Sequence, residues 1–512
     1  MRIETKEKSG RKGREKEMKE TCTYWRNPVP CHRTRREFLW EVGGGFAGLA
    51  LIDLLSRDGF FQSRAFAAGS RADETRNPLA PKPPHFPAKA KHAVFLFMNG
   101  GPSHVDTFDP KPALSRLNGS AYQGAIREIG SNGRPVGRLM QSAFDFKKCG
   151  QSGLEVSSLY PHLMEFADDL CVIRSMHTDT AAHGSGLLQM NTGNVSIGKP
   201  ALGSWLSYGL GTEQESLPSF VVMTDKGGGP TSGASNWTAG YMPAAYQGTL
   251  FRSAEPPLLD LASPTGVSDK MQRRTLDLLQ QLNRDHLSSR PGESELAARI
   301  SAYELAYRMQ TTAAEAVDLS HEDSRTRDLY GLNNPKSVDF GRKCLITRRL
   351  LERGVRFIQI YSGGGDGGQS TWDGHTECFE NHKLHAAETD QPMAALIADL
   401  KRTGLWEETL LIWGGEFGRT PTSEGLGKTG RDHNWYGFSM WLAGAGVKGG
   451  QAVGATDELG FKAVEEPCHV SDLHATVLHL MGLDHTKLTY FYQGLNQRLT
   501  GQRGNVVRKV LA

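Results

Sequence analysis

The sequence has few cysteines, and no two of them are closely spaced. The 512-residue chain carries seven, at positions 22, 31, 149, 171, 344, 378 and 468, and none forms a C-x-x-C pair. This argues against a thiolate zinc site or a thioredoxin motif. Cys171 and Cys344 lie in apolar patterns and are expected in the core. The phosphate-binding pattern G-x-x-x-x-G-K-[ST] is also missing, so a P-loop is not expected.

The chain also lacks a strong charge of one sign and a long apolar run. Its net charge is +3, which gives no indication of nucleic-acid binding. We find no apolar stretch long enough for a stable membrane span. Hydrophobic residues make up 38% and aromatic residues 8%, as in a globular protein. Glycine, with 59 residues, is abundant and often flanks clusters of polar residues.

The N-terminal region reads as a targeting segment. Residues 34–39, T-R-R-E-F-L, fit a twin-arginine export signal, a weakly apolar stretch follows at 42–55, and Ala65-Phe66-Ala67 offers a cleavage site. A basic surface helix is the alternative. We therefore predict an export signal with a basic extension over 1–67, with the twin-arginine translocase as partner and a periplasmic or extracellular mature protein. A Pro-rich linker is predicted over 68–90.

Apolar runs alternate with helical patterns along the rest of the chain. The runs predict strands, and they lie at 92–98, 170–174, 219–223, 355–361, 409–413 and 438–442. Helices are predicted at 339–352 and 391–403. This alternation predicts an α/β fold, a three-layer, doubly wound and mostly parallel sheet with helices on both faces, over 91–505.

A long, charged helical pattern interrupts this alternation at about 269–329, with one break at 288–292. We interpret it as a helical insertion. It either forms one wall of the cleft or is a solvated excursion without a role in the site.

Short polar clusters follow several of the predicted strands. Ligands of an open α/β sheet bind outside the carboxyl ends of its strands, so these clusters are expected to meet. His104 and Asp106 follow the first strand and have the side chains of metal ligands; Asn99 is a weaker candidate. The alternative is that His104 caps a turn and Asp106 initiates a helix.

The second cluster lies where the second strand turns into a helix. A hydroxyl at a helix N-terminus can attack an ester, which makes Thr180 the candidate nucleophile and Ser185 its competitor. His183 or His177 is the candidate ligand or acid. Thr and Asp are also ordinary N-caps, so a purely structural role is the alternative.

The last third of the chain holds the remaining candidates. Asp373 and His375 form a ligand pair in a glycine-rich loop, and His433 supplies another imidazole. Glu416 is expected to face the site from a strand end, and Arg419 is expected to hold a tetrahedral oxyanion. A structural ion pair between Glu416 and Arg419 is the alternative.

With these residues in place, the chain resembles the alkaline phosphatase and sulfatase superfamily. The matching features are the acid at Glu416, the glycine-rich loop leading to His433, the glycine turn at 443–450 and the helix pattern at 468–483. The stretch Thr178-Asp179-Thr180 is similar to the nucleophile turn of alkaline phosphatases. The resemblance implies one or two bound divalent ions, with zinc, manganese, magnesium and calcium as candidates.

At closer range the chain resembles an exported bacterial family known as domain of unknown function 1501. The motifs that carry this likeness are 100–110, 174–177, 372–375, 416–421 and 430–433. Two departures from the superfamily stand out. The C/S-x-P/A-x-R motif of sulfatases is missing, and Glu416-Phe417 stands where an Asp-His pair is typical, so one imidazole ligand is lost.

These observations predict an exported metal-dependent hydrolase of phosphate or sulfate esters. Its ions would be held by Asp106, Asp373, His375, Glu416 and His433, with His104 as a further ligand. The alternative is a non-catalytic relative that binds sulfated or phosphorylated glycans through Arg419 and Arg431. An intracellular mutase of the same fold is a third possibility, against which the export signal argues.

Overall fold

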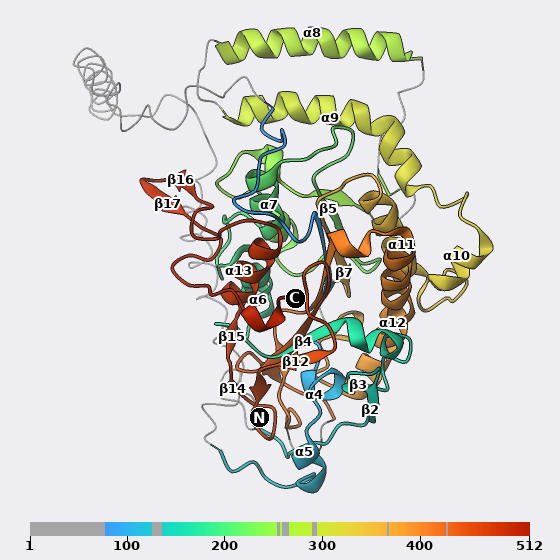
Figure 1. Ribbon diagram of the computed structural model, residues 1–512, viewed down its shortest axis with the longest axis vertical. Coiled ribbons are helices and arrows are strands. Elements are labelled where there is room, and N and C mark those ends of the chain that lie inside the picture. Colours follow the sequence, from blue (N-terminus) through green and yellow to red (C-terminus); the bar gives the residue numbers. More distant parts are fainter. Residues whose placement is uncertain are drawn as a thin grey trace, which may run out of the picture. The chain divides into compact units, whose positions relative to one another are not determined.

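A computed structural model describes residues 77–124, 136–252, 257–258, 266–288, 294–365, 368–425, 427 and 429–512 (Figure 1). The predicted export signal, its cleavage site and the first part of the linker, 68–76, lie outside the described residues. Described residues from 77 onward belong to one unit, Thr75–Ala512.

A mostly parallel sheet forms the centre of this unit. Among the described residues it has nine strands, in the order β12-β4-β11-β8-β1-β7-β5-β6, with β15 also paired to β4. Their bounds are β1 His92–Met98, β4 Leu170–His177, β5 Phe220–Met223, β6 Thr249–Phe251, β7 Phe357–Ser362, β8 Thr409–Gly414, β11 Phe438–Gly444, β12 Gln451–Val453 and β15 Cys468–His469. β11 is antiparallel to both neighbours, and the other strands run in one common direction.

The predicted α/β fold class is confirmed, and each of the six predicted strands is present. Within this sheet, the sequence did not indicate β6, β12 and β15, and these strands are only two or three residues long. A strand this short has no apolar run of its own, because its position depends on pairing with a longer neighbour.

Side chains of the central strand alternate between two apolar cores. Leu96 faces one core together with residues of α11 (Val338–Leu351) and α12 (Cys378–Thr403). Phe97 faces the other core, with residues of α6 (His183–Thr192), α7 (Leu202–Leu210) and α13 (Val470–Leu480). The sheet is therefore covered on both faces, as Figure 1 shows with α11 and α12 on one side and α7 and α13 on the other. Cys171 and Cys344 are fully buried in these cores.

Helix α12 begins well before the predicted start at residue 391. Its first half buries the polar residues Asn381, His382 and His385. The helix was predicted from regularly spaced apolar residues, and this spacing is interrupted where polar residues are buried instead. Pro392 lies inside the helix and also interrupts the helical pattern of the sequence.

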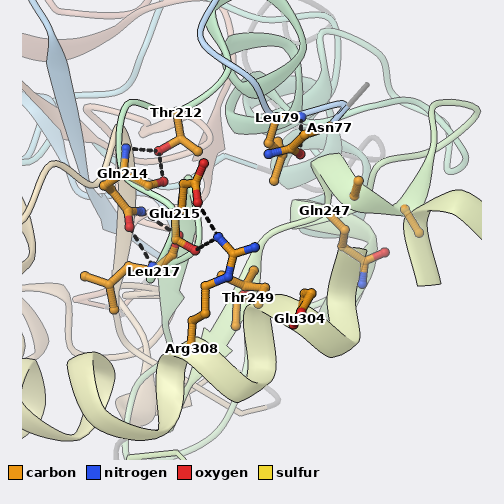
Figure 2. Close-up of a pocket in the computed structure, with 13 residues that line it drawn as sticks. Asn77, Leu79, Thr212, Gln214, Glu215, Leu217, Gln247, Thr249, Glu304 and Arg308 are labelled. Carbon is orange, nitrogen blue, oxygen red and sulfur yellow. Dashed lines mark hydrogen bonds and ion pairs between the residues drawn. The ribbon is translucent and has the colours of Figure 1, made fainter. Parts of the chain in front are cut away.

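The region predicted as a helical insertion contains α8 (Asp269–Ser288), α9 (Ser294–Val317) and α10 (Ser324–Leu329). A pocket beside α9 is lined by Thr212, Gln214 and Arg308 among others, and Arg308 Nη1 lies 2.5 Å from Glu215 Oε2 (Figure 2). This pocket contains none of the predicted site residues, so it is separate from the predicted site.

In the part of the chain that the structure describes, no helix combines the length and apolarity needed to span a membrane.

Candidate metal centre

The loops that carry the polar clusters meet at one edge of the sheet. β1, β4, β7 and β8 run in the same direction, so the loops after them begin at the same edge. β11 runs the opposite way, and the segment that precedes it starts from that same edge. This segment includes β10 (His433–Asn434), which pairs with β9 (Gly418–Arg419) and sets His433 opposite Arg419. The reversed strand is thus what brings His433 to the other clusters.

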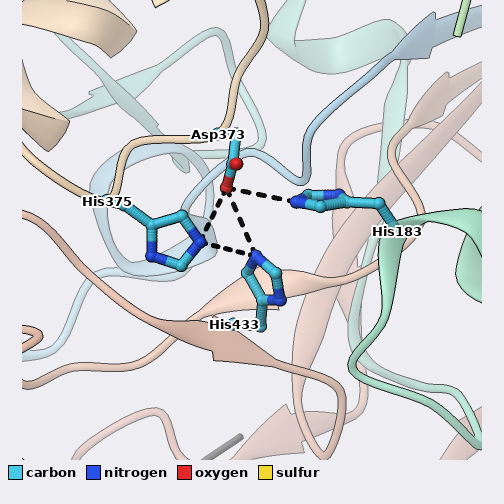
Figure 3. Close-up of side chains that lie close together, drawn as sticks. All are labelled: His183, Asp373, His375 and His433. Atoms are coloured by element: carbon cyan, nitrogen blue, oxygen red, sulfur yellow. Dashed lines mark hydrogen bonds and ion pairs between the residues drawn. The ribbon is translucent and has the colours of Figure 1, made fainter. Parts of the chain in front are cut away.

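Four side chains, from the loops after β4 and β7 and from the segment before β11, converge on one point (Figure 3). They are His183, Asp373, His375 and His433, and one donor atom of each lies within 4.8 Å of the others. Oδ1 of Asp373 is 3.2, 3.1 and 3.2 Å from Nε2 of His183, His375 and His433, respectively. The four side chains are between 12% and 28% exposed, so the cluster is accessible from solvent.

The second ring nitrogen of each histidine faces an oxygen acceptor. Nδ1 of His183 lies 2.7 Å from Glu416 Oε1, and Nδ1 of His433 lies 2.6 Å from the carbonyl oxygen of Ala181. Nδ1 of His375 lies 3.2 Å from Glu424 Oε2. The contact of His375 does not have hydrogen-bond geometry. For His183 and His433, with a metal bound, such partners favour the proton on Nδ1 and turn the lone pair of Nε2 toward the centre, as they do for other metal-bound histidines.

The charges around the cluster fit a cation. Burial lowers the pKa of His183, but hydrogen bonds to Asp373 and Glu416 outweigh this effect and raise the pKa to about 9. Burial, followed by the charge of Arg419, lowers the pKa of His433 to about 3, so this imidazole is neutral near pH 7. Nε2 of His375 and Nε2 of His433 are only 2.8 Å apart. Without a metal, a pKa of about 9 means that His183 carries a second proton near pH 7, so the cluster already attracts a positive charge. Three imidazole nitrogens and a carboxylate oxygen that face one another are the donors of a metal site, so the donor set fits a metal ion in place of that proton.

Arg419 does not have the position that its predicted role requires. Its side chain is 0% exposed, and Nε donates to the carbonyl oxygen of Gly101 at 2.9 Å. Its other nitrogens donate to the carbonyl oxygens of Gly100 and Arg431 and to Oδ1 of Asp373. Because the protein itself occupies these donors, Arg419 positions Asp373 rather than holding a substrate oxyanion.

His104 and Asp106 also lie outside the cluster, although the sequence suggested them as ligands. Asp106 is fully buried and accepts a hydrogen bond from Arg431 Nε at 2.7 Å and one from Ser103 Oγ at 2.5 Å. His104 is buried, and its Nε2 lies 2.7 Å from the carbonyl oxygen of Gly460. This agrees better with the structural alternative, in which Asp106 belongs to the short helix α4 (His104–Thr107).

Glu416 and Asn99 support the site from behind. Glu416 is fully buried, and its carboxylate accepts the backbone N–H of Gly100 at 3.0 Å and faces Nδ1 of His183. The sequence analysis expected Glu416 to bind the metal directly. The structure instead places it against His183, a candidate ligand. Asn99 is buried and donates to the carbonyl oxygen of Gly363, which ties the loop after β1 to the loop after β7.

The predicted nucleophile lies in the turn that leads into α6. The hydroxyl oxygen of Thr180 accepts the backbone N–H of Ala182 at 3.2 Å. Thr180 immediately precedes Ala181, whose carbonyl oxygen binds His433. Ser185 is half-buried in the first turn of α6. His177 is half-buried with its ring 5.1 Å from that of His469, apart from the cluster.

Glu424 is the site residue that the sequence reasoning missed. It lies in a Ser- and Gly-rich loop between Arg419 and His433, where an acid looks like an ordinary solvated residue. No spacing or strand end marks it, because only the fold of this loop brings it to His375.

Comparisons with known proteins bear on the family and the fold. A family model described as "Protein of unknown function (DUF1501)" matches residues 90–511. No curated protein sequence matches significantly. Among solved structures, the lipoteichoic acid synthase LtaP from Listeria monocytogenes matches with a TM-score of 0.34 and 9% identity over 83% of this chain and 79% of its own.

Two further solved structures are similar at the same low level. The PsFucS1 sulfatase from Pseudoalteromonas sp. has a TM-score of 0.33 and 12% identity, covering 77% of this chain and 68% of its own. The alkaline phosphatase of the Antarctic bacterium TAB5 has a TM-score of 0.32 and 10% identity, covering 77% and 99%.

Proposed function

The chain belongs to this family of proteins of unknown function, and from the geometry of its histidine cluster we propose that it is a metal-dependent hydrolase of phosphate or sulfate esters. The observation that carries the proposal is the convergence of three imidazole Nε2 atoms on Oδ1 of Asp373, at 3.1 to 3.2 Å. The superfamily resemblance of the sequence supports the choice of ester substrates.

The donor set favours zinc or manganese among the four candidate ions. Calcium and magnesium prefer oxygen ligands, whereas three of the four donors here are imidazole nitrogens. A divalent ion at this position would act as a Lewis acid on the ester and would lower the pKa of water.

The residues around the cluster have supporting roles that follow from their contacts. Glu416 and the carbonyl oxygen of Ala181 orient the imidazoles of His183 and His433, and Glu424 places a carboxylate beside His375. Arg419 holds Asp373 in place. The partial exposure of the four ligands supports catalysis over a purely structural metal site, because structural zinc sites are closed.

The glycan-binding alternative is less well supported. It depends on recognition of anions by Arg419 and Arg431, and both guanidinium groups are fully buried against protein acceptors.

The proposal also includes export by the twin-arginine translocase to the periplasm or beyond, which is supported by the T-R-R-E-F-L stretch at 34–39.

Metal content and turnover measured together test this function. We expect the protein folded with zinc or manganese to retain an ion after gel filtration and to hydrolyse aryl phosphates, phosphodiesters or sulfates. Chelation should abolish turnover, and adding back the ion should restore it.

A matched pair of variants makes the test specific. His433→Ala removes one of the converging nitrogens and should lose both metal and turnover. His321→Ala makes the same change at a side chain that is 85% exposed near α10, and should lose neither. A metal-free protein under all conditions, or full turnover in His433→Ala, would contradict the proposal.

A further inference from the structure

A hairpin near the C-terminus presents large apolar side chains to solvent. It consists of β16 (Tyr490–Tyr492) and β17 (Leu495–Gln497) and lies at the edge of the molecule (Figure 1). Residues 491–496 are all exposed, and Phe491 and Leu495 keep 65% and 64% of their surface in solvent. Single exposed apolar residues are common, so the question is whether these two belong to a larger apolar surface.

Tyrosines on one face of the hairpin fasten it to the rest of the chain. The ring of Tyr490 lies 5.5 Å from that of Tyr208, and the ring of Tyr492 stacks on Tyr241 at 4.7 Å. Because side chains alternate along a strand, Phe491 belongs to the opposite face. The hairpin is thus held in place by three aromatic contacts of its tyrosines, since Tyr490 also stacks on Tyr241.

A second exposed apolar segment adjoins the hairpin. Residues 194–198 are all exposed, and Ile197 is 69% exposed. Lys199, directly after this segment, places Nζ 5.5 Å from the centre of the Tyr241 ring, the same ring that stacks on Tyr492. The two segments therefore meet at Tyr241. We call the surface that they form the apolar patch, and its members are Val195, Ile197, Phe491, Tyr492 and Leu495.

The charges around the apolar patch have one sign. Four basic residues and no acid occur in the segments that form and support it, namely 193–200, 240–248 and 487–503. Two of the bases, Lys487 and Arg503, pair with acids outside these segments. Within the described part of the chain, the other two, Lys199 and Arg498, form no ion pair. Their positive charges are therefore left uncompensated beside the patch.

We propose that the apolar patch docks on the anionic surface of a lipid bilayer. Exposed apolar side chains flanked by bases are typical of proteins that bind the membrane interface without spanning it. Branched aliphatic side chains such as Ile197 and Leu495 suit acyl chains. A glycan would need a free aromatic face, whereas Tyr241 and Tyr492 stack on each other. This inference does not depend on the proposed hydrolase.

Co-flotation of the full chain with vesicles is the first test. The protein should float with vesicles of phosphatidylglycerol and phosphatidylcholine, and it should bind vesicles of phosphatidylcholine alone at least about 5-fold more weakly. Raising the salt from about 0.1 M to about 1 M should reduce this difference, because the salt screens the charges. Equal binding to the two kinds of vesicle would overturn the choice of an anionic surface.

A double variant tests the apolar side chains. Phe491→Ser with Leu495→Ser keeps the tyrosines that anchor the hairpin, and vesicle binding should fall by at least about 10-fold because less apolar surface leaves water. Val464→Ser is the matched control. Val464 is 59% exposed on β14 (Ala463–Glu465), outside the patch, and two glutamates follow it, so its replacement should leave vesicle binding unchanged.

Hydrogen exchange shows which part of the chain meets the bilayer. This local readout is needed because residues 42–55 form a weakly apolar stretch of their own. On addition of the anionic vesicles, the backbone amides of 194–198 and 491–496 should exchange more slowly, and those next to Val464 should not change. Vesicle binding without this protection would overturn the role of the patch.

A second copy of the chain is the competing occupant. Two facing patches would bring Lys199 and Arg498 of both copies together, so repulsion argues against this arrangement. Light scattering after gel filtration should therefore give the same mass for the wild type and the double variant. A wild-type dimer that becomes a monomer in the double variant, together with no binding to vesicles, would overturn the proposal in favour of self-association.

Discussion

The carboxylate of Glu416 lies 2.7 Å from Nδ1 of His183, although 233 residues separate the two in the chain. The opposite ring nitrogen of His183 points at Asp373, 3.2 Å away. The histidine is thus held between two carboxylates, one buried behind the site and one inside the cluster. This arrangement fixes the orientation of the ring and makes Glu416 a positioning residue for the candidate metal centre.

Glu416→Gln tests that relationship. The glutamine keeps an acceptor for the N–H of Gly100 but loses the charge that orients His183, so metal affinity should fall by about 10- to 100-fold while the fold is kept. Competition with a coloured chelator measures the affinity. An unchanged affinity would mean that His183 is oriented without Glu416.

Gly100→Ala should disturb the site through the backbone. Gly100 has a φ of +112°, and a Cβ there would lie 2.6 Å from the backbone nitrogen of Asp373. We expect a loss of about 1–3 kcal/mol in the free energy of unfolding from the backbone conformation, together with weaker metal binding because Asp373 must move.

Gly119→Ala is the matched control for this change. Gly119 also has a positive φ, +77°, but a Cβ there would have no atom within 4 Å. The free energy of unfolding of this variant should fall by a similar amount because of the backbone conformation, and metal binding should stay intact. Equal metal affinity in the two variants would contradict the role of the close approach at Gly100.

The buried pair of Asp106 and Arg431 predicts a dependence of stability on pH. Burial raises the pKa of Asp106, but the charge of Arg431 and the hydrogen bond from Ser103 outweigh burial and lower the pKa below its usual value. A carboxyl with a lowered pKa in the folded state stabilises the protein above its unfolded-state pKa of about 3.9 and loses this contribution as the pH falls through the folded value.

Asp106→Asn should therefore remove this part of the acid dependence. Denaturant unfolding between about pH 5 and 2 should show a shallower decline for the variant than for the wild type. The free energy of unfolding of the variant should also fall by about 3–5 kcal/mol at neutral pH, because Arg431 is left buried without its charged partner. Parallel pH profiles in the two proteins would contradict the prediction.

The interpretation of Thr180 as a nucleophile predicts that Thr180→Ala lowers kcat by at least about 100-fold without loss of metal. Thr180→Ser keeps a hydroxyl and should retain most of the turnover. Ser185→Ala tests the competing hydroxyl on α6. Turnover that survives in Thr180→Ala and in Ser185→Ala would indicate that water, rather than either hydroxyl, attacks the ester.

The sequence by itself determined six of the nine strands described in the sheet and the identity of most of the candidate ligands. Apolar runs such as 92–98 are long enough to specify buried strands, and glycine-flanked polar residues after them, including Asp373 and His433, mark the loops at the strand ends. These signals are local, so a reading of neighbouring residues can recover them. The family resemblance rests on the same short motifs.

Only the tertiary structure decided which of those polar residues meet. Asp106 and Asp373 look alike in sequence, yet Arg431 pairs with one and three imidazoles surround the other. Glu424 and the carbonyl oxygen of Ala181 have no sequence signal, and Arg419 is turned inward by carbonyl oxygens more than 300 residues away. Such contacts depend on strand order and on the reversed direction of β11, because residues distant in the chain become neighbours only when the sheet is assembled.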